Sequence, residues 1–598
     1  MAKSLEEFLA GSENEEEGAG AVGGVGAAQD FIRHSHEALR QALQKPLSDA
    51  RRKCNVLLRQ AIKAFEREDL AKAGKLALEA SSADPSCGQA YHLLALTLER
   101  LGALSKAVAM YQKAFELDPK DSDLYLNLGL AAWKLKLFDG AERCFKLYID
   151  MKPDNPSGYN NLAAVLRDKG RFEDAIELLQ AAICKMPEAA ILWNTVGTVI
   201  GERGDFEQAQ TFYQEAIRLN PKFGRAYHNV GYALTHTGHL NEAISYFERA
   251  MPFLEVEHDR FEAEHALSFC LIGTGQLERG WKLYEVRNHP RFRTATLFAA
   301  RAPRWQGEDI AGKTLLVLGE QGLGDEIMFA SLVPDMLERT GPQGRVLLAC
   351  ERRLVPLFSR SFPAAICGPH AGRSHNAKVL RGAPWAAGKL EPDVVTPAAS
   401  PLQWLRPHVE SFGIGRAYLK PDPARVAHWR ERLAALPGEG AVAGLCWRSM
   451  LITTQRAKYY SPLEAWAQAF GGTGLRIVNL QYGDCARDIA EARERYGLTI
   501  HAFDDIDLKN NLDDAAALSV ACDLVVTAPT AAGALAAATG AETWFVLAGR
   551  GWVEMGLDHY PWYANTRAFK PQAFGDWRNV MAHLNRALKE RSTARAVA

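Results

Sequence analysis

Small residues and prolines recur at a fixed interval through the first half of the chain. Five prolines stand 34 residues apart, and small residues between them keep the same period. This period predicts stacked pairs of helices, in which small residues permit close approach and each proline ends a unit. We therefore expect an α-helical superhelix with a concave groove suited to an extended peptide. The two series are Pro85, Pro119, Pro153, Pro187 and Pro221, and Ala95, Gly129, Ala163, Gly197 and Gly231.

The apolar pattern changes after Arg287. Short β-branched or Leu-rich runs then alternate with helical stretches, which predicts parallel strands covered by helices. The length of this half fits two nucleotide-fold lobes of about 125 to 150 residues each. The expected strands are 314–318, 345–349, 442–447, 476–480, 524–527 and 543–547, the expected helices are 325–340, 423–436, 485–496 and 530–539, and the expected hinge is 419–423.

The amino-acid composition of the first residues predicts one further segment. The Glu-rich start and the Gly/Ala-rich run after it cannot bury a core, which predicts a disordered tail. The domain prediction is a tail at 1–30, a lead-in helix at 31–53, a superhelix of six regular repeats and a divergent seventh at 54–290, a linker at 291–312, and lobes at 313–420 and 421–598.

Charge and cysteine content narrow the class of protein. The net charge is -1 and the pI is near 7.0, so we expect no nucleic-acid partner. No apolar run approaches the roughly 18 residues of a membrane helix, and no secretory signal is visible. The ten cysteines contain no C-x-x-C spacing. We therefore expect a cytoplasmic protein without membrane insertion.

A glycine-rich stretch follows the first expected strand. Glycines at a strand-to-helix turn let a ligand approach the backbone at the positive end of a helix. Asp325 has two interpretations of equal weight: a helix N-cap worth about 1 kcal/mol, or a general base. Glu326 and Glu320 are the alternative bases. The stretch reads Gly319-Glu320-Gln321-Gly322-Leu323-Gly324-Asp325-Glu326.

These patterns resemble known families. The repeats are similar to tetratricopeptide repeats (TPRs). The stretch 313–336 resembles the opening of heptosyltransferase-like glycosyltransferases of the GT-B fold, which implies an acceptor-side first lobe and Asp325 as base. The fold class is therefore predicted as a TPR superhelix followed by two Rossmann-like GT-B lobes.

The second lobe carries candidate donor-binding residues. Arg448 comes directly after the expected strand 442–447, and Arg456 and Lys458 come eight and ten residues after Arg448. Thr530 stands at the start of an expected helix of small residues. Because parallel sheets bind ligands at the carboxyl ends of their strands, we expect these residues to contact a nucleotide phosphate together with Gly322 and Gly324. The alternatives are a surface loop and simple N-capping. The resemblance implies Asp-Thr-(three residues)-His here, but the chain has Pro529-Thr530-Ala531-Ala532-Gly533-Ala534, which argues against an ADP-heptose donor.

A polar ladder is predicted along the groove. Asn127, Asn161, Thr195 and Asn229 occupy equivalent repeat positions and could hold a peptide backbone, as in the protein O-linked N-acetylglucosamine transferases, which the chain resembles in its order of parts. The alternative is that each side chain bonds within its helix pair.

Taken together, the chain resembles bacterial TPR glycosyltransferases that modify flagellin. The resemblance implies metal-independent transfer, without a cofactor, of a nonulosonic acid such as pseudaminic acid from its CMP-activated donor to Ser/Thr of flagellin. One alternative is a catalytically silent TPR adaptor or flagellar secretion chaperone. Another is an N-acetylglucosamine or heptose transferase acting on protein or glycan.

Overall fold

The computed structural model describes residues 48–320, 322–375, 378–413, 415–450, 452 and 454–597. The predicted tail at 1–30 and residues 31–47 of the predicted lead-in helix lie outside the described residues. The chain divides between Pro221 and Lys222 into two compact units. This division lies inside the repeat region and not at residue 290, where the sequence pattern changes.

The first unit consists of antiparallel helix pairs. Its first described helix starts at Asp49, with Ser48 as N-cap accepting a hydrogen bond from the Arg51 N–H at 3.2 Å, so this helix begins before residue 54, where the sequence predicts the repeats to start. The pairs are α3 (Asp49–Glu66) with α4 (Leu70–Ala83), α5 (Gly88–Arg100) with α6 (Leu104–Leu117), α7 (Ser122–Lys134) with α8 (Phe138–Met151), α9 (Pro156–Asp168) with α10 (Phe172–Lys185), and α11 (Ala190–Arg203) with α12 (Phe206–Leu219).

The small repeat positions have the packing role that the sequence predicts. A Cβ atom on Gly129 would lie 2.6 Å from the ring of Phe145, and one on Gly197 would lie 2.6 Å from the ring of Tyr213. Both rings are buried. The aromatic side chain of the second helix therefore fills the space that the missing Cβ leaves in the first.

The second unit begins with two more helix pairs. These are α13 (Gly224–His236) with α14 (Leu240–Ala250), and α15 (Glu257–Gly273) with α16 (Leu277–Tyr284), followed by the 3₁₀ turn η2 (Glu285–Asn288). Trp281 of α16 is buried and donates its indole N–H to the carbonyl of Arg406 at 2.9 Å. Ile272, Leu277, Trp281 and Tyr284 share one apolar cluster with residues of the α/β region. The last helix pair, α15 with α16, is thus part of the core of this unit.

The N-terminal lobe contains a four-stranded parallel sheet in the order β4-β3-β2-β7. Its strands are β2 (Thr314–Leu318), β3 (Arg345–Cys350), β4 (Ala365–Pro369) and β7 (Val394–Pro397), and its helices are α17 (Leu323–Phe329), α18 (Val333–Thr340), α19 (Val355–Ser361) and α20 (Leu402–Leu405). A smaller sheet pairs β1 (Thr296–Ala299), β6 (Lys378–Gly382) and β5 (Ala371–His375).

The C-terminal lobe contains a six-stranded parallel sheet in the order β10-β9-β8-β11-β12-β13. Numbered within the lobe this is 3-2-1-4-5-6, the doubly wound order in which ligands bind where the winding reverses. The strands are β8 (Val442–Cys446), β9 (Arg476–Asn479), β10 (Ile500–His501), β11 (Leu524–Thr527), β12 (Thr543–Val546) and β13 (Thr566–Phe569).

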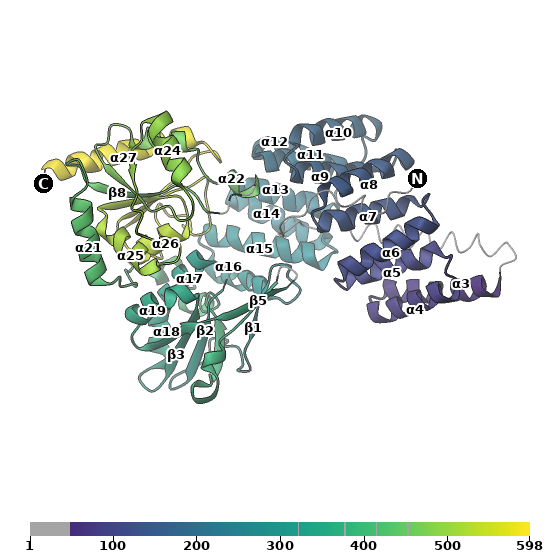
Figure 1. Cartoon of the computed structure of the whole chain (residues 1–598), viewed down its shortest axis with the longest axis horizontal. Coiled ribbons are helices and arrows are strands. Elements are labelled where there is room, and N and C mark those ends of the chain that lie inside the picture. The colour runs from purple at the N-terminus through teal and green to yellow at the C-terminus, as the bar shows by residue number, and fades with distance from the viewer. Residues whose placement is uncertain are drawn as a thin grey trace. The chain divides into compact units, whose positions relative to one another are not determined.

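Helices cover both faces of this sheet. Figure 1 shows α24 (Ala486–Tyr496) and α27 (Trp577–Val597) on one side of the strands, and α21 (Pro423–Ala434), α25 (Leu512–Ala521) and α26 (Ala531–Ala538) on the other. Two apolar clusters correspond to these faces: Ala443 and Leu445 of β8 join the first, whereas Val442 and Cys446 join the second. The remaining helices are α22 (Thr454–Ala457) and α23 (Leu463–Phe470).

The α/β prediction is confirmed at the level of parallel sheets with helices. The predicted helix at 325–340 is wrong as a single element, because it is divided into α17, a 3₁₀ turn and α18, where Pro334 occupies the first turn of α18 and lacks a backbone N–H. Among the described elements of the α/β region, the sequence missed the strands β1, β4, β5, β6, β7, β10 and β13 and the helices α19, α20, α22, α23, α25 and α27. None of the described helices has the length and apolar character that a bilayer crossing requires.

We predict that Gly197→Ala lowers the free energy of unfolding by about 1–3 kcal/mol, because the new methyl group overlaps the buried Tyr213 ring. Gly74→Ala in α4 is the matched control. Its Cβ would meet its nearest neighbour, Thr97, at 3.4 Å, and alanine favours a helix interior by about 1 kcal/mol over glycine. Urea unfolding of the full chain measures both. Equal changes in the free energy of unfolding for the two substitutions would contradict the packing of the Tyr213 ring against Gly197.

Candidate functional site

The first part of the candidate site is the turn between β2 and α17. Asp325 lies in the first turn of α17, and its Oδ2 accepts a hydrogen bond from the Gly322 N–H at 3.0 Å. One of the two interpretations predicted Asp325 as the N-cap, but the N-cap residue of α17 is Gly322; Asp325 contributes to capping through this one bond from the third position of the helix. The bond does not occupy both carboxylate oxygens, so it is compatible with the other role.

The surroundings of Asp325 disfavour its charged form. Burial raises the pKa of Asp325 to about 6, and the negative charges of Glu320 and Glu326 act in the same direction, while the Gly322 N–H opposes them. A carboxyl group with this pKa is ionised at neutral pH and can still accept a proton. That combination suits a general base.

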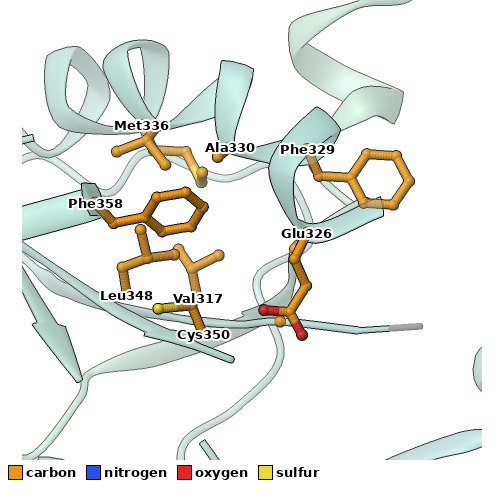
Figure 2. Close-up of a pocket in the computed structure, with 11 residues that line it drawn as sticks. Val317, Glu326, Phe329, Ala330, Met336, Leu348, Cys350 and Phe358 are labelled. Atoms are coloured by element: carbon orange, nitrogen blue, oxygen red, sulfur yellow. The ribbon is translucent and has the colours of Figure 1, made fainter. Parts of the chain in front are cut away.

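Glu326, the alternative base, is held by three groups. Its carboxylate accepts the Glu351 N–H at 2.7 Å and a guanidinium N–H of Arg381 at 2.9 Å, and Nε2 of His370 lies 3.0 Å from Oε1. Figure 2 shows Glu326 at one end of a small space in the N-terminal lobe whose other labelled residues are apolar. The cavity measures about 10 Å³, room for about one water molecule. This placement favours a structural role for Glu326.

Glu320 is fully buried. Its carboxylate accepts two N–H groups of Arg287 at 2.9 Å each and the Ala399 N–H at 2.7 Å. Sequence reasoning missed Arg287, although a buried carboxylate requires a cation or several donors nearby. The isolated glutamate in the glycine-rich turn was the signal that could have prompted the search.

The second part of the site is the winding reversal of the C-terminal lobe. Cys446 of β8 lies opposite Thr527 of β11, so the segments after these strands are neighbours. Thr530 is the N-cap of α26: its hydroxyl accepts the Gly533 N–H at 3.3 Å and lies 3.5 Å from the Cys446 sulfur. The capping alternative is therefore seen in the structure.

Arg448 follows β8 and has several partners. Its guanidinium donates to Asp488 of α24 at 2.8 Å and to the Ser449 carbonyl at 3.2 Å. The side chain of Gln481, after β9, accepts the Trp447 and Arg448 backbone N–H groups at 3.2 and 3.0 Å. Sequence reasoning missed Gln481 and Asp488. Gln481 could have been found by examining the carboxyl end of every expected strand.

Arg456 and Lys458 lie in α22 and the turn after it. Arg456 is exposed, and the Lys458 ammonium lies 5.8 Å from the centre of the Tyr459 ring. The Tyr459 hydroxyl lies 2.7 Å from Nε2 of His236 in α13. Burial lowers the pKa of His236 to about 4, and Lys458 adds to this effect. The segment with these two cations is thus fixed to the repeat helices of the same unit.

The two parts of the site meet at the N-termini of α17 and α26. A Cβ atom on Gly324 would lie 3.5 Å from the Cα of Ala531, which directly follows Thr530. The charge of Asp325 also adds to burial in raising the pKa of Tyr563, a residue of the C-terminal lobe. Asp325 and Thr530 are therefore brought to one place from opposite lobes, and Arg448 adjoins Thr530 through β8 and β11.

The predicted polar ladder is mostly internal. Asn127, Asn161 and Thr195 are buried. The Asn127 amide nitrogen lies 2.9 Å from Nε2 of His92, and the Thr195 hydroxyl donates to Asn160 at 2.6 Å. These contacts join neighbouring repeats and favour the packing alternative for the first unit. In the second unit Asn229 is half-buried, with its Oδ1 3.2 Å from Nδ1 of His228.

The described residues contain no group of three or more His, Cys, Asp and Glu side chains that could hold a metal ion. The ten cysteines are free thiols.

Comparison with known proteins identifies the repeats. Models described as TPR repeat or tetratricopeptide repeat match residues 98–136, 126–190, 192–223 and 212–245. The chain is therefore a TPR-containing protein with an α/β region of parallel sheets after the repeats.

Among curated proteins, the chain is similar to Protein FlbA of Caulobacter vibrioides. The two are 39% identical over 327 residues, which cover 55% of this chain and 55% of FlbA. The chain thus matches about half the length of this relative.

Three solved structures illustrate what the chain resembles in its fold. The Cut9–Hcn1 hetero-tetramer of APC/C matches at 17% identity and a TM-score of 0.32, covering 41% of this chain and 46% of the other. A tetratricopeptide repeat protein from Parabacteroides merdae matches at 15% identity and a TM-score of 0.33, covering 40% of this chain and 97% of the other. MamA matches at 25% identity and a TM-score of 0.23, covering 28% of this chain and 92% of the other.

We predict that Asp325→Asn changes the pH dependence of unfolding. The folded pKa of Asp325 is about 6, above the reference value of 3.8, so between these values the folded state binds more protons than the unfolded state. Stability due to this group is therefore lost as the pH rises through that window. The wild type therefore loses free energy of unfolding between pH 4 and pH 7 that the variant does not lose. The difference in free energy of unfolding, variant minus wild type, should be larger at pH 7 than at pH 4.

Urea unfolding at pH values from 4 to 7 measures this difference. Asp309→Asn, which removes an exposed carboxylate of the linker, controls for the loss of one negative charge. A stability difference between Asp325→Asn and wild type that stays constant with pH would refute the assignment.

Proposed function

We propose that this protein is a protein O-glycosyltransferase whose two α/β lobes act as a GT-B pair. The repeats would bind the acceptor protein, and the site between the lobes would transfer a sugar to a Ser or Thr hydroxyl. The observation that carries this proposal is the approach of the N-termini of α17 and α26, seen at Gly324 and Ala531 beside Asp325 and Thr530, each after the carboxyl end of a parallel strand. Ligands of doubly wound sheets bind at such edges.

Asp325 is proposed as the general base. It would take the proton of the acceptor hydroxyl while the oxygen forms a bond to the anomeric carbon of the donor. The bond between that carbon and the nucleotide phosphate oxygen breaks at the same time, and the nucleotide leaves with the electron pair. The raised pKa of Asp325 supports this role, because a base is most effective when its pKa lies near the working pH.

The departing phosphate would be stabilised on the C-terminal lobe. The backbone N–H groups at the start of α26 and the Thr530 hydroxyl offer donors there, and Arg448 offers a cation beside them. Asp488 holds the Arg448 side chain at 2.8 Å, which orients the guanidinium before a ligand arrives. Arg456, Lys458, Gly322 and Gly324 complete the proposed donor set.

The particular substrates follow from the family resemblance. Bacterial TPR glycosyltransferases of the flagellin-modifying type use a CMP-activated nonulosonic acid such as pseudaminic acid, and we propose the same donor here, with flagellin as acceptor in the cytoplasm. Transfer of N-acetylglucosamine or heptose to protein or glycan is the alternative within the same chemistry.

A TPR adaptor or flagellar secretion chaperone is the second candidate function. The missing acid and histidine in the segment 529–534 favour it. Calorimetric titration with CMP separates the two functions, because an adaptor without a donor site should not bind the nucleotide.

We predict that Asp325→Asn lowers kcat for transfer about 100- to 10,000-fold. The wild-type rate should rise with pH through about 6 and then level, since only the ionised carboxylate accepts a proton. Intact-mass analysis of flagellin after incubation with the protein and the CMP-activated sugar measures transfer.

The matched control is Asp335→Asn. This change removes a carboxylate of α18 that pairs with Arg406 at 2.7 Å, and it should keep kcat near the wild-type value. Unimpaired transfer by Asp325→Asn would exclude Asp325 as the base, and no transfer by the wild type would exclude the proposed function.

A further inference from the structure

A buried ionic network joins the end of the repeats to the glycine-rich turn. Arg287 lies in η2, directly after the last repeat helix, and only 4% of its surface is exposed. Its guanidinium forms two parallel hydrogen bonds to Glu320 at 2.9 Å each. This is the bidentate geometry that gives an arginine–carboxylate pair both strength and a fixed orientation.

The network satisfies the remaining donors of Arg287. Its Nη1 donates to the Tyr284 carbonyl and to Glu285, both at 2.9 Å, and the guanidinium carbon lies 4.1 Å from the centre of the Tyr284 ring. Glu285 in turn pairs with Arg304 and accepts the Ser400 hydroxyl at 2.8 Å. Two arginines therefore balance two carboxylates.

Three chain segments meet at Glu320. It belongs to the turn after β2, Ala399 follows β7, and Arg287 comes from the repeats. Asp325 lies five residues after Glu320 in the chain, so the position of Glu320 constrains where α17 begins. We propose that Arg287 is a positioning residue, which acts through Glu320 to fix the glycine-rich turn and with it the Asp325 carboxylate.

This inference rests on the proposed function for its catalytic consequence. The groups facing Asp325 are Glu320 in the turn, Glu326 on its own helix, Tyr563 from the C-terminal lobe, and the Thr530–Ala531 end of α26. Arg287 stabilises the charge of the buried Glu320, and that charge disfavours ionisation of Asp325. The repeats therefore influence both the place and the proton affinity of the base.

The test is the double variant Arg287→Met with Glu320→Gln, which removes both charges and leaves neither partner buried alone. Amide hydrogen exchange of the peptide 319–329 should become faster than in the wild type. In the transfer assay kcat should fall about tenfold or more, since small displacements of a reacting group are costly, while KM for the acceptor stays within about threefold. The acid limb of the pH profile should move to lower pH, because Asp325 loses the repulsion of Glu320.

The matched control is Arg406→Met with Asp335→Asn. This pair is also bidentate, at 3.0 and 2.7 Å, and lies in the same lobe, but its hydrogen bonds join α18 to the segment after α20 and not to the glycine-rich turn. It should leave the exchange of 319–329, kcat and the pH profile near wild type.

Unchanged exchange at 319–329 in the Arg287/Glu320 variant would overturn the inference, as would equal effects of the two double variants. Faster exchange combined with wild-type kcat and pH profile would also overturn it. In that case Arg287 would hold the turn, but the turn would not determine the position or the pKa of Asp325. If the wild type transfers no sugar, the proposed function fails, and the exchange comparison still decides whether Arg287 holds the turn.

Discussion

The buried pair of Arg287 and Glu320 holds three segments of the second unit together. Both residues are almost completely removed from water, and leaving one partner of such a pair alone typically costs about 3–5 kcal/mol. The chain must therefore bring the end of the repeats, the turn after β2 and the segment after β7 together whenever this unit folds. The division of the chain at residues 221 and 222 is consistent with this requirement, since the last helix pair, α15 with α16, shares a core with the lobes.

The parallel sheets create the environment of Asp325. Each sheet directs the turns that follow its strands toward one edge, and the edges of the two lobes meet at α17 and α26. A carboxyl group at that meeting point loses water on several sides and faces two other carboxylates in its own segment, which raises its pKa. The fold thus disfavours the charged form of the residue that the proposed chemistry uses as base. Such a compromise between stability and activity is common at catalytic sites.

The repeats of the first unit use their polar residues differently from the expectation of a peptide-binding ladder. Asn127, Asn161 and Thr195 are buried. The bonds of Asn127 and Thr195 join one repeat to the next, and Asn161 accepts a hydrogen bond from its neighbour Asn160, which in turn accepts the Thr195 hydroxyl. Buried amide and hydroxyl groups of this kind fix the register of stacked helices because each needs a matching partner. The binding surface of the superhelix must then be supplied by other side chains of the array.

Local patterns were sufficient for the repeats, for six core strands and for the glycine-rich turn, because period, chain length and turn chemistry are properties of neighbouring residues. Strands β2 and β11 have the bounds that the apolar runs predict, and Asp325 and Thr530 stand at helix starts as expected. The roles of Glu326 and Glu320 could not be read in this way, since their partners Arg381 and Arg287 lie 55 and 33 residues away. The edge strands β10 and β13 were missed because short strands carry little pattern. Only tertiary contacts distinguish the adjacent carboxylates of Asp325 and Glu326. They leave Asp325 at the junction of the lobes and bury Glu326 among its partners, because burial and nearby charge depend on segments that are distant in the chain.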